Sequence, residues 1–181
     1  MGSWWAAPSP GRVERIAGTG ELDDISALAA EMGYGGGFDF AADGSLYIAD
    51  NTHSRVRRVD PEGVISTVLG LGEIGFDRDG HGPKVGLSSP ERVVVDEARG
   101  CLLVVDADNS RIGALDLDVF RFTVAGTGAY EDPLELRGRP LEMSIWRPAG
   151  LELSPEGDLL IAERAGHRVL RWVGAEAALE P

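Results

Sequence analysis

The sequence is poor in cysteine and in positive charge, and each shortage excludes a class of protein. The single cysteine, Cys101, cannot build a disulfide framework or a multi-cysteine zinc site within one chain. It lies in an apolar run over residues 101–105, so we expect a buried side chain. With 17 basic and 30 acidic residues, the net charge of −13 repels nucleic-acid phosphates and anionic lipid headgroups. We therefore expect no nucleic-acid partner and no membrane partner.

Long apolar runs are also missing. No stretch approaches the roughly 20 apolar residues that a membrane-spanning helix needs. Residues 1–8 lack the basic-then-apolar order of a secretory signal, and Ala6 stands where a myristoylation motif has Ser or Thr. These absences favour a cytoplasmic location. The length of 181 residues suits one domain with a substantial core.

What the sequence does contain is one segment repeated three times. Residues 46–56, 102–112 and 159–169 align without gaps. Each segment begins with an apolar run too short for a helix and reaches an acidic residue. Four further residues then lead to an arginine followed by a β-branched residue. This pattern predicts a strand, a tight turn and a second strand.

Further strands are predicted on both sides of each repeat. Alternating runs at 38–40, 93–95 and 151–153 come before glycine turns and are predicted to be innermost strands. Residues 64–69 and 119–124 are predicted to be outermost strands, and both lead into a Gly-x-Gly pair. Residues 13–16 have the same form, whereas no fourth strand follows residues 171–173. The chain therefore opens with an outer strand and lacks one at its third repeat.

Repeated units of four short strands are typical of a β-propeller. We predict an all-β fold with three four-stranded blades per chain over residues 12–174, between an N-terminal extension (1–11) and a C-terminal tail (175–181). Within the link at 21–34, residues 26–31 are predicted to form a helical turn. The strand order places this link, the links at 73–89 and 129–147, and the acidic-to-arginine turns on one face. That loop face is where we expect a binding site.

The repeat resembles the NHL repeat. Ala49-Asp50 followed by Arg55-Val56 matches one part of that motif, and the Val-Ala-Gly-Thr-Gly run at 124–128 matches another. The resemblance covers about residues 12–174, although Glu163 replaces the usual Asp, and Ser54 and Ser110 replace the usual His. It implies a propeller of about six blades. Such propellers mostly bind proteins, peptides or RNA, and their relatives include metal-dependent lactonases and lyases.

Three blades are half of six, so two apolar blade faces should lie open to water. We expect a homodimer, in which residues 13–16 of one chain supply the missing outer strand to the third blade of the other. The alternative is that the chain is part of a longer NHL protein, whose remaining blades form the other propeller half.

Polar side chains at the acidic-to-arginine turns make up the candidate binding face. They are Asp50, Asn51, His53, Arg55, Asp106, Asp108, Asn109, Arg111, Glu163, Arg164, His167 and Arg168. The pairs Asp50–Arg55, Asp106–Arg111 and Glu163–Arg168 could form a ring of charges at the channel mouth. The structural interpretation is stronger, because a carboxylate that accepts turn amides and pairs with an arginine fixes a blade corner.

Catalytic chemistry lacks a candidate in this sequence. The three histidines, His53, His81 and His167, fall in the predicted loop face beside carboxylates such as Asp77 and Asp79, but their spacing does not indicate convergence on a metal. No Gly-x-Ser-x-Gly elbow is present. We predict no metal and no cofactor, and we assign no catalytic residue.

The sequence favours a non-catalytic module that binds a protein or peptide or holds an assembly together. Aromatic anchors for such a ligand are available at Trp4, Trp5, Tyr34, Tyr130 and Trp146. Trp172 is predicted to be core instead. The competing function is a metal-dependent lactonase, hydrolase or lyase whose acidic and histidine side chains converge in the channel mouth.

Overall fold

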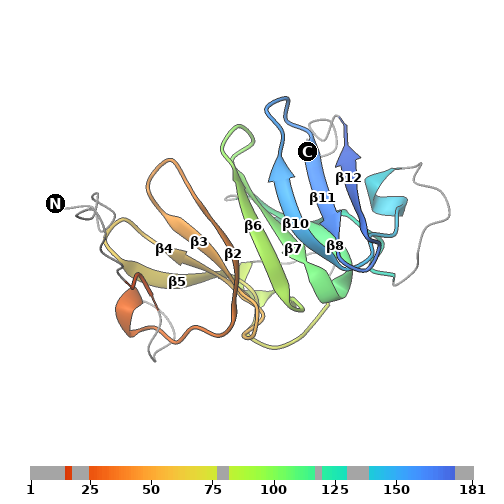
Figure 1. Cartoon of the computed structure of the whole chain (residues 1–181). Helices are drawn as coiled ribbons and strands as arrows, with labels where there is room; N and C mark the ends of the chain where they lie inside the picture. The colour runs from red at the N-terminus through yellow and green to blue at the C-terminus, as the bar shows by residue number, and fades with distance from the viewer. Residues whose placement is uncertain (1–14, 18–24, 77–81, 117–119, 130–138, 174–181) are drawn as a thin grey trace.

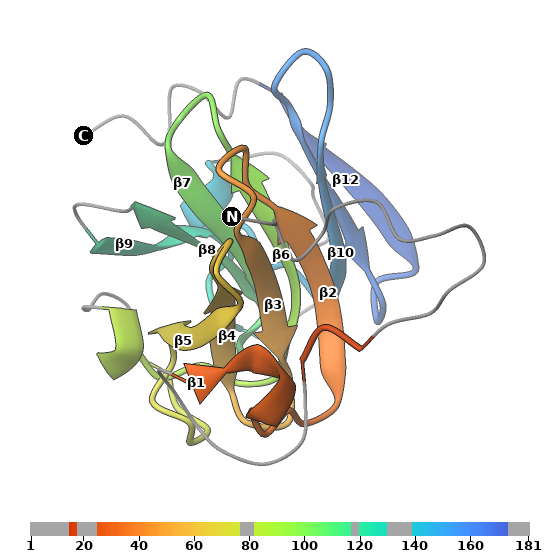
Figure 2. The same cartoon turned by 90° about the vertical axis from the view of Figure 1, so that its left-hand side faces the viewer.

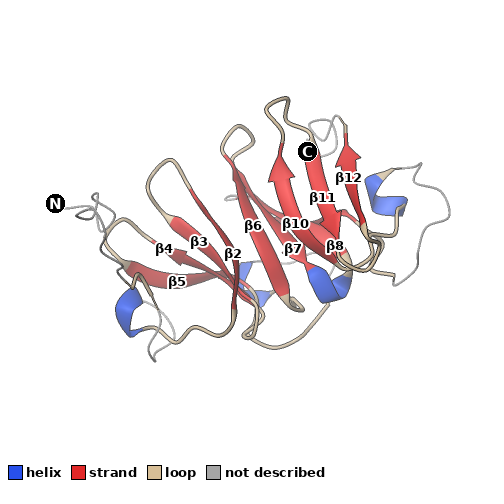
Figure 3. Ribbon diagram, in the orientation of Figure 1, coloured by secondary structure: helices blue, strands red, loops and turns tan. Residues whose placement is uncertain are grey.

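A computed structural model describes residues 15–17, 25–76, 82–116, 120–129 and 139–173. These residues form three antiparallel β-sheets that stand side by side like the blades of a propeller, connected by single turns of 3₁₀ helix (Figures 1 and 3). The predicted all-β, propeller-like fold is therefore confirmed. In the described part of the chain, no helix is long and apolar enough to cross a membrane.

Each sheet follows the chain from its inner edge outwards, with one exception in the first sheet. The first sheet has the order β1-β5-β4-β3-β2, the second β6-β7-β8-β9 and the third β10-β11-β12. The strands are β1 (Ile25–Ser26), β2 (Gly35–Phe40), β3 (Leu46–Asp50), β4 (Arg55–Val59), β5 (Val64–Leu69), β6 (Pro90–Asp96), β7 (Cys101–Asp106), β8 (Arg111–Asp116), β9 (Phe120–Ala125), β10 (Pro148–Leu153), β11 (Leu159–Glu163) and β12 (Arg168–Trp172).

The three predicted hairpins, the predicted inner strands and the outer strands predicted at 64–69 and 119–124 are present, with ends shifted by a few residues. The first sheet also has a strand that the sequence did not predict. Residues 25 and 26 form β1, which pairs with β5 through Ile25↔Ile65 and Ser26↔Val64, as Figure 2 shows at the edge of that sheet. The predicted helical turn at 26–31 is present as a single 3₁₀ turn, Ala27–Ala29.

Half of the strand predicted at residues 13–16 falls outside the described residues, and the described half, Arg15 and Ile16, is not in a strand. The C-terminal tail at 175–181 also lies outside them. Within the described residues the third sheet has three strands, as predicted.

The core lies between the sheets because alternate residues of each strand point to opposite neighbours. On β7, Leu102 and Val104 pack against the first sheet, whereas Leu103 and Val105 pack towards the third. Every residue of β7 is buried, which suits its continuous apolar sequence. Full burial of each such side chain contributes roughly 1.5–3 kcal/mol, so the two intersheet layers supply most of the driving force for folding.

The free face of the first sheet is less open than predicted. Ala27 and Ala30 pack on its outer strands, against Leu46, Val59 and Ile65. These alanines belong to the segment that precedes β2, so the chain itself covers the outer part of this face. Its inner part remains exposed.

Candidate functional site

A buried carboxylate stands at the end of the second strand of every sheet. Asp50 and Asp106 are fully buried and Glu163 is 4% exposed. Each accepts a hydrogen bond from a backbone N–H of the link that precedes its own sheet. The donors are Gly33 at 3.1 Å, Ser88 at 2.7 Å and Trp146 at 2.6 Å, respectively. The carboxylates thus fasten each link to a sheet corner. The expectation that the amide donors belong to the adjacent turn is wrong for these three bonds.

The corner of the second sheet is the most complete. Asp106 Oδ2 accepts hydrogen bonds from Arg111 Nε at 2.7 Å and Asn109 Nδ2 at 2.8 Å. Arg111 is itself fully buried, donates to the Gly86 carbonyl at 3.1 Å and lies 4.4 Å from the centroid of the Phe76 ring. Burial raises the pKa of the Asp106 carboxyl, against the opposing attraction of Arg111. The predicted Asp106–Arg111 pair is therefore present and closed to solvent.

The other two corners differ in their cations. Glu163 pairs with Arg168, as predicted. In the first sheet the predicted Asp50–Arg55 pair is wrong: Asp50 Oδ2 lies 2.9 Å from His53 Nδ1 and 3.8 Å from Arg57 Nη1. The guanidinium of Arg55 lies against Gly72 instead. His53 is the repeat equivalent of Asn109, whose Nδ2 contacts the corresponding Asp106 carboxylate.

The residue before each of the three arginines has a left-handed backbone. Ser54, Ser110 and His167 have φ values of 48°, 49° and 49°. Small polar residues and His tolerate this region better than β-branched residues do. His167 shares this turn conformation, and its side chain is exposed.

The remaining predicted site residues link neighbouring sheets. Asn51 Nδ2 donates to the Pro90 carbonyl at 3.3 Å, and Asn109 Nδ2 also donates to the Gly75 carbonyl at 2.8 Å. Asp108 pairs at 2.8 Å with Arg147, which immediately precedes the third sheet, and Arg164 pairs with Glu91 of the second sheet at 3.3 Å. Backbone bonds from Asn51, Asp108 and Arg164 to link carbonyls place turns and links on one face, as predicted.

The buried carboxylates do not form a ring of accessible charge, because Asp50, Asp106 and Glu163 are enclosed at separate corners. Among the described residues, no three His, Cys, Asp or Glu side chains are close enough to hold a metal ion. Of the residues considered for such a site, His81, Asp77 and Asp79 lie outside the described part of the chain.

The aromatic residues predicted as possible ligand anchors differ in how exposed they are. Tyr34 is 75% exposed on the loop face, whereas Trp146 is half-buried. Trp172 is also half-buried and packs against the core between the second and third sheets, so its predicted core position holds in part. Trp4, Trp5 and Tyr130 lie outside the described residues.

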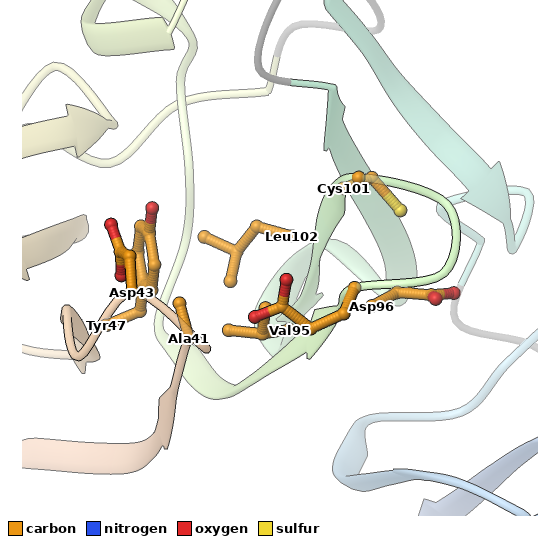
Figure 4. A pocket seen from close by; sticks show the side chains of 9 residues that line it. Ala41, Asp43, Tyr47, Val95, Asp96, Cys101 and Leu102 are labelled. Carbon is orange, nitrogen blue, oxygen red and sulfur yellow. The ribbon is translucent and has the colours of Figure 1, made fainter.

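A hollow that the sequence did not predict opens at the opposite strand ends, between the β2–β3 and β6–β7 turns (Figure 4). Its acidic side chains already have partners. Asp43 accepts from the Ser45 N–H at 2.8 Å and from Arg58 at 3.2 Å, and Asp96 pairs with Arg99. The hydrogen bond from the Ser45 N–H, helped by the Ser45 hydroxyl and the charge of Arg58, holds the pKa of Asp43 below its usual value against the opposing effect of partial burial. These groups stabilise hairpin turns and leave no free acid–base pair.

Cys101 borders this hollow and is 8% exposed, which confirms its predicted burial. Burial raises the pKa of its thiol to about 11. At pH 8 the reactive thiolate should therefore be on the order of 100-fold scarcer than for an exposed cysteine. We expect a thiol reagent such as DTNB to leave the folded chain unmodified and to label one thiol per chain in denaturant. Rapid labelling of the folded chain would contradict this burial.

Comparison with known proteins supports a propeller fold. No family model matches the chain. A protein of unknown function from Bacteroides thetaiotaomicron superimposes with a TM-score of 0.63 and 27% identity, over 73% of this chain and 33% of that one. An auxiliary nutrient binding protein from the same species gives 0.58 and 22%, over 73% and 35%. The chain thus spans about a third of the solved structures it matches.

A curated protein also shares part of the sequence. Protein SUPPRESSOR OF QUENCHING 1, chloroplastic, from Arabidopsis thaliana is 34% identical over 79 residues, which is 43% of this chain and 7% of that protein. The sheets and these likenesses define the chain as a propeller-type protein. The match covers too little of either protein to carry an activity across.

Proposed function

We propose that this chain is a non-catalytic NHL-type propeller module that binds a protein or peptide on its loop face. The observation that supports this proposal most directly is that the acidic side chains at the sheet corners have a structural role. Asp50, Asp106 and Glu163 are buried and committed to a link amide and a cation, so they hold the loops in place. A rigid scaffold that presents loops is a common arrangement for binding sites.

The loop face also offers contacts suited to a protein ligand. Tyr34 provides an exposed aromatic ring, and Arg164 and His167 are exposed at the turn of the third sheet. Aromatic and arginine side chains supply much of the energy of protein interfaces. The net charge of −13 favours a basic peptide as the ligand.

In this proposal the three sheets are three blades of a six-bladed ring, which a second copy of the chain completes. Residues 13–16 of each copy add an outer strand to β12 of the other. The alternative is that further blades of a longer protein complete the ring.

The binding function is tested by selecting peptides from a display library against the purified chain. Selected peptides should be basic and should lose at least about tenfold in affinity on Tyr34→Ala, since an aromatic hot-spot residue typically costs about 2 kcal/mol or more when truncated. The control is Glu156→Ala, an exposed change at the opposite strand ends that should leave affinity unchanged. Peptides that are insensitive to Tyr34→Ala would refute this site.

Metal analysis of the same preparation tests the competing enzyme. We expect no stoichiometric calcium or zinc and no gain of lactone hydrolysis on adding either ion. The non-catalytic assignment would be overturned if the chain binds one metal ion and has lactonase activity, and if a chelator removes both the ion and the activity.

A further inference from the structure

The two contacts between neighbouring sheets use the same repeat positions. On β3, Tyr47 and Ala49 face forward to the second sheet, and their equivalents on β7, Leu103 and Val105, face forward to the third. Leu102 and Val104 face back to the first sheet, as their equivalents Leu159 and Ile161 face back to the second. Each sheet therefore has a forward face and a backward face, and a forward face packs on the next backward face.

The third sheet carries a forward face without a covering sheet in the described chain. Val169 is 68% exposed, although its repeat equivalents, Val56 and Ile112, are fully buried. Leu160 and Ala162 lie beside it and are the equivalents of Leu103 and Val105. These side chains are apolar, like their buried equivalents in the other two sheets, but no sheet of the described chain packs against them.

The first sheet carries the matching backward face. Phe38 and Phe40 are 57% and 47% exposed and pair across the sheet with Ile48 and Leu46. Their equivalents on β6 are Val93, which is fully buried between sheets, and Val95, which packs against the same cluster. Two half-exposed phenylalanines on an inner strand form an apolar surface of the kind that marks an interface.

The segment that covers the outer part of this backward face does not obstruct a partner. Gly33 and Ser88 donate equivalent hydrogen bonds to Asp50 and Asp106, which aligns Ala30 with Val85. Val85 packs within the intact contact between the first and second sheets. Ala30 therefore lies where a link residue, Val85, lies in the intact contact between two sheets, so it is compatible with a partner sheet on this face.

From this equivalence we infer that the forward face of the third sheet binds the backward face of the first sheet of a second copy. This inference rests on the proposed propeller module and specifies its partner. Because each copy has one face of each kind, two copies make two identical contacts and close into a ring about a two-fold axis. A second copy fits because the required pair of faces is the pair that already joins sheets within the chain.

Light scattering coupled to gel filtration tests this inference on the full chain. We expect about twice the monomer mass of 19.2 kDa. Phe38→Asp and Val169→Asp should each give monomers, because a charge in either face spoils both contacts of the ring. The matched control is Leu71→Asp, which alters an apolar residue of the link after β5 that is 52% exposed and should leave the dimer intact. Circular dichroism of each variant checks that the sheets still form.

Mixing the two monomeric variants separates this pairing from other dimers. In a mixed pair, Val169 of the Phe38→Asp chain meets Phe38 of the Val169→Asp chain, so one contact is of wild-type composition and a dimer should return. A contact of the third sheet with its own copy would instead leave Phe38→Asp dimeric and would overturn the inference. A folded wild-type monomer at micromolar concentration would also overturn it, and the peptide experiment on the loop face would still decide the binding function.

Discussion

Asp106→Asn should lower the free energy of unfolding by about 3–5 kcal/mol, the usual cost of removing one partner from a buried ion pair. Both Asp106 and Arg111 are fully buried and joined at 2.7 Å. Asparagine keeps the size of the side chain but removes the negative charge that Arg111 Nε contacts in a place that water does not reach. It also weakens the bond from the Ser88 N–H, so the link before β6 should loosen.

Urea unfolding followed by tryptophan fluorescence measures this loss, and Asp108→Asn is the matched control. Asp108 lies two residues along the chain and pairs with Arg147, but both side chains are partly exposed. A pair of this kind contributes about 0–1 kcal/mol. Equal losses in the two variants would show that the corner carboxylate is not a structural clamp, and Asp106 would return to the list of binding candidates.

The strands could be predicted because their signal is local and repeated. Three apolar runs of similar length, each followed by an acidic residue and an arginine, fix the hairpins independently of the rest of the fold. The strand β1 has no such signal. It is two residues long, and it forms because the link before β2 passes the free edge of β5.

The sequence predicted which residues form the candidate site but not all of their hydrogen-bond and ion-pair partners. The alignment identified Asp50, Asp106 and Glu163 as equivalent, and the structure places all three at equivalent corners. Their amide donors come from irregular links 17 or 18 residues earlier, which no periodic pattern reveals. The wrong assignment of Arg55 has a similar cause, since strand register pairs Arg55 with Asp50 but cannot show that His53 and Arg57 lie beside the Asp50 carboxylate.

The burial of the turn residues differs from what the sequence predicts, and this difference changes which residues can contact a ligand. Polar residues in a turn are usually exposed, which made the acidic-to-arginine turns a candidate binding face. In the structure, their buried members hold the links, and the exposed ones, such as Arg164, project from the loop face. The proposed binding surface therefore consists of the links and turn tips that the carboxylates fix in place.

The second large effect is expected at Gly70, where β5 ends. Its φ of +99° belongs to the region that favours glycine, and an added Cβ would lie 2.3 Å from the carbonyl oxygen of Ser54. Gly126 repeats both features at β9, with φ of +95° and the Ser110 carbonyl at 2.5 Å. In both sheets the Gly-x-Gly pair thus closes directly on the left-handed turn that precedes the arginine.

Gly70→Ala should therefore cost about 2–5 kcal/mol, since backbone strain of about 1–2 kcal/mol adds to an overpacking cost of about 1–3 kcal/mol. Gly63→Ala separates the two contributions: its φ is +82°, but its Cβ would meet nothing within 4 Å. That control should lose only the strain of about 1–2 kcal/mol in the same urea experiment. If both variants lose the same amount, the Ser54 carbonyl moves aside at little cost. The strand end would then not be locked against the turn, and the loop face would lack one of the contacts that make it rigid.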